Sequence, residues 1–365
     1  MQISIETIKE IVCYGGMAPS GDNLQPWHFV WHPKQSLIQL FFVPGRGNSF
    51  FDVNNYAPYV ALGAVIENIA IAASHFGLEP EINYFPEREN NLLIANIYLS
   101  WTKGERDPLY EYIPKRCVNR KPYYKYWPVP IYVKEALRRE VARFPGVKLH
   151  WVDDSKLIFR LAKLVWKADW IRFEMQSLHE DLHKKLRFTK EEKEQTRDGL
   201  AVDTLEVGKL GEWFLKFTRP WSRMQALNRL GMSKIASLQT FLLMYSAPIA
   251  CLVTTERSEN TDFLTGGRAI QRIFLRATKH RLAIQPITVL TLFILRLLKR
   301  NGEGFSPQHL SLIRQLYADF KEIFSQNSFS EAGGLIMLFR LGYAPPPTSS
   351  ALRRKVEDIL TIKRD

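Results

Sequence analysis

The chain has 365 residues, 46% of them hydrophobic, which is enough for a sizeable core and typical of a globular protein rather than a disordered one. The formal net charge is 50 − 37 = +13, so anionic partners are favoured, whether nucleic acid, anionic membrane or a phosphorylated cofactor. No sequence pattern of a DNA- or RNA-binding module accompanies this charge, and we expect no nucleic-acid partner.

Nothing in the sequence indicates secretion or membrane insertion. The first ten residues are polar and charged, unlike a signal peptide. The longest apolar run, residues 287–298, is shorter than the ~20 residues of a membrane span. Three scattered cysteines suit a reducing compartment. We therefore predict a cytoplasmic protein without stable membrane insertion.

The first part of the chain, residues 1–111, has the pattern of an α+β lobe. Apolar periodicity predicts helices over residues 4–14 and 59–76. Runs rich in β-branched and aromatic residues predict three strands, which cover residues 27–31, 37–43 and 92–101.

Residues 112–365 repeat this order of elements and form a predicted second lobe. We expect helices over residues 133–144 and 266–280, and strands over residues 147–152, 248–254 and 334–341. A helical, charged excursion at about residues 155–240 has no counterpart in the first lobe. We expect this excursion to be a lid that excludes water, although its tryptophans could equally pack its helices onto the second lobe.

A short echo connects the two lobes. The segment LGAVIEN at residues 62–68 matches GGRAIQR at residues 266–272, and each has a glycine near the expected start of an apolar helix. This match predicts an internally duplicated α+β unit.

The loop APSGDNLQPW, residues 18–27, is the most informative stretch. Pro19 and Gly21 shape a tight turn, while Ser20, Asn23 and Gln25 bring hydrogen-bonding groups close together. Such a loop suits a planar heteroaromatic ligand, and an ordinary Pro/Gly turn is the alternative. A second segment, RCVNR at residues 116–120, carries two forked guanidiniums that suit a phosphate.

Residues 18–27 closely resemble the A-P-S-x-x-N-x-Q-P-W signature of the FMN-dependent nitroreductase family. Residues 116–120 resemble the basic segment of its fused-half, Acg-like branch. Residues 267–277 resemble the central helix, and residues 341–354 the closing element. The resemblance implies a nitroreductase-like fold of two pseudo-symmetric fused lobes, each with a mixed or antiparallel sheet flanked by helices, plus the helical lid.

The resemblance also implies a cofactor site for FMN. Arg116, Asn119, Arg120 and Arg353 would hold the phosphate and ribityl chain, and a backbone N–H around Gly266 and Gly267 would approach flavin N5. The remaining implied cofactor-binding residues lie in the first loop: Pro19, Ser20, Gly21, Asn23 and Gln25.

This chain departs from the family pattern in ways that affect the site. The hydroxyl expected in the basic segment is replaced by Val118, and the second lobe has no copy of the 18–27 loop. The resemblance therefore implies one FMN per chain. A monomer can build this site, because the two lobes replace the usual homodimer.

The implied activity is electron transfer between NAD(P)H and a small aromatic, quinone or nitro substrate. No residue stands out as a proton donor, so the catalytic residues stay unassigned. A closed lid would instead make the chain an FMN-sequestering protein.

A competing motif lies in the excursion. Residues 179–183 read HEDLH and fit the H-E-x-x-H pattern of zinc proteases, with Glu180 as base and Glu206 as a third ligand outside any motif. The following lysines favour a solvated helix face, and we expect no metal here.

Overall fold

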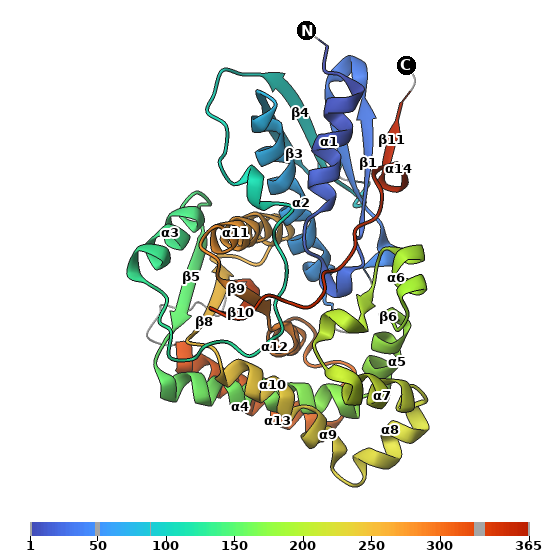
Figure 1. Cartoon of the computed structure of the whole chain (residues 1–365), viewed down its shortest axis with the longest axis vertical. Coiled ribbons are helices and arrows are strands. Elements are labelled where there is room, and N and C mark those ends of the chain that lie inside the picture. Colours follow the sequence, from blue (N-terminus) through green and yellow to red (C-terminus); the bar gives the residue numbers. More distant parts are fainter. Residues whose placement is uncertain (1, 48–51, 88, 325–332, 364–365) are drawn as a thin grey trace.

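The computed structural model describes residues 2–47, 52–87, 89–324 and 333–363, and its helices surround two main β-sheets (Figure 1). The first sheet has the strand order β11-β1-β2-β4-β3, and the second has the order β5-β8-β10-β9. Strand β11 runs parallel to β1, whereas the other pairs of both sheets are antiparallel. The predicted α+β class, with mixed or antiparallel sheets, is confirmed.

The first sheet collects strands from both ends of the chain. Its strands are β1 (Trp27–His32), β2 (Leu37–Phe42), β3 (Leu78–Tyr84), β4 (Leu93–Trp101) and β11 (Leu360–Ile362). Helix α1 (Ile5–Gly16) begins where the Ser4 hydroxyl accepts a hydrogen bond from the Thr7 amide at 3.1 Å. The tail was assigned to the second lobe, but its strand β11 crosses to the first sheet and pairs with β1, where Leu360 lies opposite Phe29. Figure 1 shows this tail running from β10, near the centre of the molecule, to β11 beside the first sheet.

The second sheet is built around a fully buried strand. Its strands are β5 (Val147–Val152), β8 (Ile249–Thr255), β9 (Ala283–Pro286) and β10 (Leu335–Gly342). All seven residues of β8 are buried, which explains its continuous apolar sequence. Four helices accompany the sheet, namely α3 (Ile131–Val141), α11 (Asn260–Lys279), α12 (Thr288–Arg300) and α13 (Pro307–Phe324).

Two long helices, α2 (Tyr56–His75) and α11, cross at the centre of the molecule. Helix α2 is apolar on all sides, with 16 of its 20 residues buried. By length and composition alone, α2 could cross a membrane. However, 83% of its most apolar stretch is buried inside the protein, as in the core helix of a soluble fold.

Glycines permit the close approach of α2 and α11. A Cβ on Gly63 would lie 2.0 Å from the Leu264 carbonyl oxygen, and a Cβ on Gly267 would lie 2.1 Å from the Val60 carbonyl oxygen. These contacts are related by one offset, because 264 − 60 and 267 − 63 both equal 204. The helices therefore cross about a local pseudo-two-fold axis at these glycines.

Polar side chains extend the same symmetry along the crossing. Gln271 Nε2 donates to Asn68 Oδ1 at 2.6 Å, and Arg272 Nη1 lies 2.8 Å from Glu67 Oε1. With the same offset of 204, Glu67 corresponds to Gln271 and Asn68 corresponds to Arg272. The two bonds therefore cross over between the helices, as a two-fold axis requires. Arg272 also binds Glu140 at 2.6 Å, so a buried ionic cluster connects α2, α3 and α11. Burial alone would raise the pKa of Glu140, but Arg272 and Arg276 hold it below its usual value.

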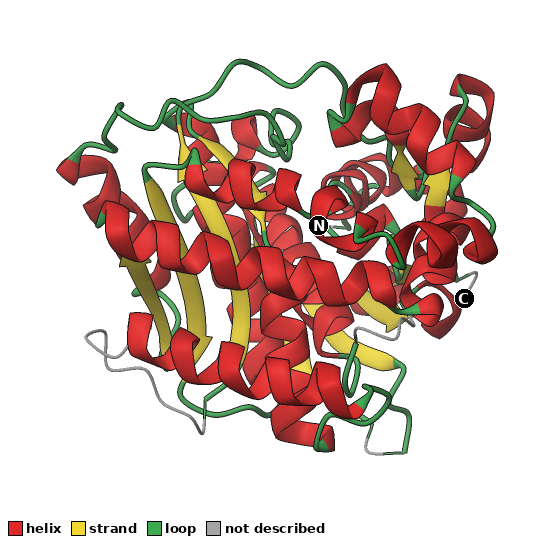
Figure 2. Ribbon diagram, turned by 90° about the horizontal axis from the view of Figure 1, so that it is seen from below, coloured by secondary structure: helices red, strands yellow, loops and turns green. Residues whose placement is uncertain are grey.

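The excursion is helical, as predicted. Its elements are α4 (Ser155–Glu174), α5 (Gln176–Lys185), β6 (Leu186–Arg187), α6 (Lys190–Thr196), β7 (Leu200–Ala201), α7 (Gly208–Phe217), α8 (Trp221–Asn228), α9 (Met232–Ala236) and α10 (Leu238–Tyr245). Helices α4 and α10 pack together, and α4 contacts α12 and α13 beneath the second sheet. Figure 2 shows long helices crossing the strands of this sheet. The rest of the excursion extends toward the first sheet.

Candidate functional site

The loop of residues 18–27 adopts an unusual backbone. Its short 3-10 turn (Gly21–Asn23) is followed by β1, and three of its residues have positive φ, namely Asp22 at 49°, Asn23 at 55° and Gln25 at 53°. Non-glycine residues rarely occupy this region, and such positions cluster at functional sites. The Ser20 hydroxyl stabilises the turn by accepting a hydrogen bond from the Gln25 amide at 3.0 Å. Pro19 and Gly21 precede and open this turn, and a Cβ on Gly21 would meet nothing within 4 Å.

The side chains of this loop hold the C-terminal tail. Asn23 Nδ2 donates to the Leu352 carbonyl at 3.1 Å, and Arg353 Nη1 donates to Asn23 Oδ1 at 2.7 Å. Gln25 Oε1 accepts from the Arg354 amide at 2.8 Å. The structure therefore brings Arg353 together with Asn23 and Gln25, although Arg353 lies more than 300 residues further along the chain.

Arg116, which is buried, and Arg353, which is half-buried, lie near each other beside this loop. Arg116 is 9% exposed, and its Nη2 makes a 3.4 Å contact with the Met17 carbonyl oxygen while its Nε and Nη1 have no partner. Nε of Arg353 is also enclosed and without a partner. Burial lowers the pKa of Arg116 to about 10, and burial with the nearby Arg116 lowers the pKa of Arg353 to about 9. Both therefore stay cationic at neutral pH.

No carboxylate forms an ion pair with Arg116 or Arg353 within the described ranges. The buried Arg340 provides a contrast, because its Nε binds Gln285 and its other nitrogens bind carbonyls of Leu243 and Lys121. Buried charges are normally paired or hydrogen-bonded. Arg116 and Arg353 therefore have enclosed nitrogens without an acceptor, and forked guanidinium donors suit phosphate oxygens.

The other predicted residues of the basic segment have structural partners. Asn119 Nδ2 donates to the Pro345 carbonyl at 2.8 Å, and its Oδ1 accepts from the Lys121 amide at 3.0 Å. Arg120 Nη1 donates to the Thr204 carbonyl at 3.0 Å, and burial lowers the pKa of Arg120. Both residues fix the walls around Arg116.

The helix expected to start at Gly266 starts earlier, because α11 begins at Asn260 and both Gly266 and Gly267 lie inside it. A Cβ on Gly266 would lie 2.6 Å from the Ile336 side chain, and a Cβ on Gly267 would meet the Val60 backbone, so both glycines permit close packing. Their approach to a flavin through a backbone N–H stays a prediction.

Cys117 directly follows Arg116, whose positive charge favours the thiolate. Burial dominates instead and raises the pKa of Cys117, although Arg116 opposes the effect. The structure therefore gives no support for a reactive thiolate at this position.

Residues 185–206 of the excursion lie over the loop and the tail, and we call them the cover segment. Gln25 Nε2 donates to the Arg197 carbonyl at 2.8 Å, and the Gly199 amide donates to the Asn23 carbonyl at 3.3 Å. Lys185 forms an ion pair with Asp22 of the loop, and Asp198 forms one with Arg46, which follows β2. The tail is bound at two further points, where Arg197 donates to the Arg353 carbonyl and Glu206 accepts from Thr348. The cover segment thus lies against the loop that carries Asn23 and the tail that carries Arg353, and its role as a lid stays a prediction.

The tryptophans of the excursion do not gather at this site. Trp166 Nε1 donates to the Lys234 carbonyl at 2.9 Å, and Trp221 packs on the His179 ring. The alternative that these side chains pack the excursion helices is therefore the one that the contacts favour.

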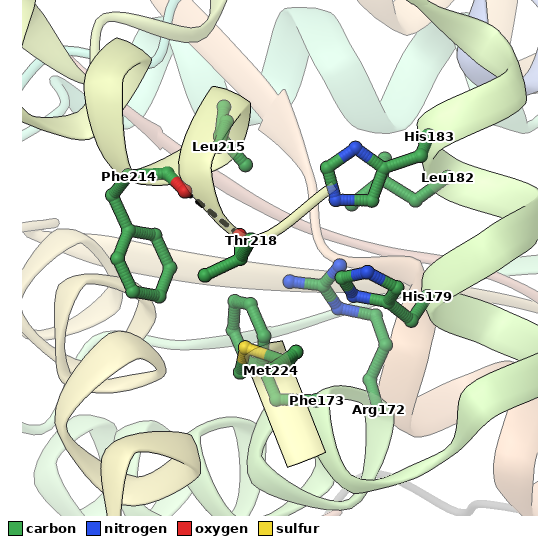
Figure 3. A pocket seen from close by; sticks show the side chains of 9 residues that line it. All are labelled: Arg172, Phe173, His179, Leu182, His183, Phe214, Leu215, Thr218 and Met224. Atoms are coloured by element: carbon green, nitrogen blue, oxygen red, sulfur yellow. Dashed lines mark hydrogen bonds between the residues drawn. The ribbon is translucent and has the colours of Figure 1, made fainter. Parts of the chain in front are cut away.

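The H-E-x-x-H motif lies in α5, and Figure 3 shows His179 and His183 pointing into a small cavity beside Arg172 and Met224. The ring centroids are 4.3 Å apart, and His179 Nε2 lies 3.3 Å from the Arg219 carbonyl oxygen. Glu206, the candidate third ligand, accepts hydrogen bonds from Thr348 instead. Among the described residues no group of three His, Cys, Asp or Glu side chains is arranged to hold a metal ion.

The two histidines make the excursion sensitive to acid. Burial, with the neighbouring His179, lowers the pKa of His183 to about 4, below its ordinary value of 6.5. The unfolded chain therefore takes up the proton first, and stability falls as the pH drops from 6.5 towards 4. We expect the free energy of unfolding of His183→Leu to fall by roughly 1–2 kcal/mol less than that of the unaltered chain over this pH range. Thermal unfolding at pH 7 and pH 4.5 measures it, and equal pH dependence in both proteins would contradict the assignment.

Comparison with known proteins supports the resemblance drawn from residues 18–27. No protein-family model matches the chain. An uncharacterized protein from Mycobacterium tuberculosis is 26% identical over 354 residues, which cover 95% of this chain and 47% of that relative. A putative NAD(P)H nitroreductase from the same organism is 25% identical over 127 residues, which cover 34% of this chain and 36% of that protein. The chain thus spans about half the length, or less, of these relatives.

Solved structures with a similar arrangement include an FMN-dependent nitroreductase from Mycobacterium smegmatis in complex with NADPH. It is 16% identical, covers 70% of this chain and 97% of its own, and gives a TM-score of 0.37. A BluB-like flavoprotein from Clostridium difficile is 13% identical, and the match covers 71% of this chain and 100% of that protein with a TM-score of 0.39. The resemblance to nitroreductases is confirmed as a resemblance. The fused-half branch stays a prediction.

Proposed function

We propose that this chain is a nitroreductase-like flavoprotein that binds one FMN, with the phosphate at Arg116 and Arg353. The observation that carries the proposal is the pair of guanidiniums, Arg116 buried and Arg353 half-buried, with enclosed unpaired nitrogens and no carboxylate partner among the described residues. FMN supplies a phosphate of about −1.5 to −2 charge at pH 7, as other phosphate monoesters do. The A-P-S loop beside the arginines, at residues 18–27, supports a flavin over other phosphorylated ligands.

The chain's own residues bind and enclose the cofactor in this proposal. Arg116 and Arg353 neutralise the phosphate, while Ser20, Asn23 and Gln25 hold the loop and tail in place around them. When bound, FMN supplies the hydride and electron chemistry, and NAD(P)H is the proposed donor for reduction of a small aromatic, quinone or nitro substrate. The cover segment excludes water from the site.

Only one such arginine pair is proposed per chain, because the second lobe has no copy of the 18–27 loop. The two lobes, joined by the Gly63 and Gly267 crossing, then act as the two halves of a duplicated unit and require no second chain. An absorbance spectrum of the purified protein, with flavin counted per chain, tests this. We expect a ratio near one after FMN is added, and a chain that takes up no FMN would overturn the proposal.

A second function, FMN sequestration, is supported by the cover segment. Its Arg197 carbonyl accepts from Gln25 and its Gly199 amide donates to the Asn23 carbonyl, so the cover segment is bound to the loop that would meet the flavin and would hinder NAD(P)H. Anaerobic addition of NADPH to the flavin-loaded protein separates the two functions. Bleaching supports the oxidoreductase, whereas bleaching by dithionite alone supports sequestration.

An Asp198→Ala variant sharpens this experiment. Asp198 binds Arg46 at 2.8 Å and Arg187 at 2.7 Å, so its removal loosens the cover segment without altering the arginine pair. Asp153→Ala, which loses an ion pair to Lys134 far from the site, is the control. Faster bleaching in Asp198→Ala alone would indicate that the cover segment limits access of the donor.

A further inference from the structure

An unusual concentration of exposed apolar side chains lies on helices α7 to α10. Leu210 is 79% exposed, Trp213 58% and Leu230 82%. The set, which we call the α7–α10 surface, consists of seven residues: Leu210, Trp213, Phe217, Leu230, Ile235, Leu238 and Leu242. Contiguous exposed apolar surface marks a site of interaction with a protein or a membrane.

The helices of this surface follow one another in space as well as in sequence. Arg223 of α8 donates to the Phe217 carbonyl of α7 at 3.1 Å, and α8 contacts α9, which contacts α10. Figure 1 shows α8, α9 and α10 along the lower edge of the molecule, with α7 beside α8.

Helix α7 has the pattern of an interfacial helix. Leu210, Trp213 and Phe217 recur at intervals of three and four residues, and the rings of Trp213 and Phe217 stack with centroids 5.2 Å apart. Lys209 and Lys216 are exposed on the same short helix, and none of its residues is fully buried. Tryptophan with flanking lysine is typical of helices that lie at a lipid headgroup layer.

A second stripe runs along α9 and α10. Ile235, Leu238 and Leu242 are exposed at intervals of three and four residues. Lys234 is exposed beside Ile235, and Phe159 of α4 packs edge-on against Phe241 of α10. The stripe therefore combines aliphatic side chains with a basic border.

The charge of this segment selects the partner. Residues 208–245 contain six basic residues and one acidic residue, Glu212, so their net charge is 6 − 1 = +5. Two copies meeting through this face would place +5 against +5, which opposes self-association. An anionic lipid surface complements both the charge and the apolar side chains.

We propose that the α7–α10 surface docks on an anionic lipid membrane as a peripheral contact, without any membrane span. The aliphatic and aromatic side chains enter the headgroup layer, and the basic residues bind lipid phosphates. This inference is independent of the flavin site, because none of the seven residues contacts the loop, the tail or the arginine pair.

Vesicle co-sedimentation tests the proposal with the full chain. We expect binding to vesicles of phosphatidylcholine mixed equally with phosphatidylglycerol, and weak binding to phosphatidylcholine alone. Ile235→Glu/Leu238→Glu should lower partitioning about tenfold or more, and Lys209→Gln/Lys216→Gln roughly fivefold per residue at low salt. Ile131→Glu is the matched control, because Ile131 is equally exposed on α3, outside this surface.

Two further readouts make the result decisive. The emission of Trp213 should shift to shorter wavelength on vesicles, as the difference from Trp213→Phe shows. Equal partitioning of Ile235→Glu/Leu238→Glu and the unaltered chain would overturn the proposal. So would a dimer in sedimentation velocity that the same variant abolishes, because the surface would then be a self-interface.

Discussion

Arg116→Met and Arg353→Met should each weaken FMN binding on the order of a hundredfold, about 3 kcal/mol. Each removes a cation that has enclosed nitrogens without a protein partner in the described structure, namely Nε and Nη1 of Arg116 and Nε of Arg353. The remaining guanidinium then faces the phosphate alone. Titration of the flavin-free protein by flavin fluorescence or calorimetry measures the change, with Arg139→Met on the exposed face of α3 as control.

Arg116→Met should leave the flavin-free protein as stable as before, or more stable. Arg116 is buried, its Nε and Nη1 have no partner, and burial lowers its pKa. Replacing such a charge by an apolar side chain is often neutral or stabilising. Arg353→Met should instead cost some stability, because Arg353 Nη1 donates to Asn23 Oδ1. Arg340→Met should also be destabilising, because Arg340 satisfies carbonyl groups of Leu243 and Lys121 in the core.

Riboflavin separates phosphate recognition from loss of the whole site. The unaltered chain should prefer FMN to riboflavin, and both arginine variants should lose most of that preference while riboflavin affinity changes little. A variant that loses riboflavin and FMN equally would mean that the site had collapsed, and would count against a phosphate role.

Local sequence patterns predicted most of the elements, because periodicity records which face of a helix or strand is buried. The strand over residues 147–152 was predicted with its observed bounds. Strand β3 was not predicted, since LEPEINY carries a proline and two glutamates, which an edge strand tolerates. Strand β11 was not predicted either, because three residues held by pairing with β1 carry no pattern of their own.

The site was partly predictable for a similar reason. The loop and the arginines carry recognisable residue types, but the sequence could not indicate that Asn23 and Gln25 bind the tail. Met17 and Phe274, which lie against Arg116, gave no sequence signal. Gly266 and Gly267 resembled a helix start, because glycine often marks an end of a helix in sequence. In the structure these two positions require glycine because other elements approach α11 closely there.

Gly267→Ala should have the largest effect on stability, costing about 3 kcal/mol or more. Within an uncrowded helix the change would be favourable by roughly 1 kcal/mol, since alanine is the better helix former. Here the new Cβ would lie 2.1 Å from the Val60 carbonyl oxygen, and backbone cannot rotate away as a side chain does. The midpoint temperature of thermal unfolding should fall by several degrees. Gly45→Ala is the control, because a Cβ on Gly45 would meet nothing within 4 Å.

The pseudo-two-fold axis gives this prediction a second test. Gly63→Ala creates the equivalent clash with the Leu264 carbonyl at 2.0 Å, so either substitution pushes the same two helices apart. Once the helices have separated, the second clash is largely relieved, and the double variant should lose clearly less stability than the sum of the single losses. Strict additivity would mean that the two glycines act locally and that no common axis connects them. Separation should also weaken FMN binding, because Arg116 contacts both Phe274 of α11 and the Met17 carbonyl at the end of α1, and α1 packs on α2.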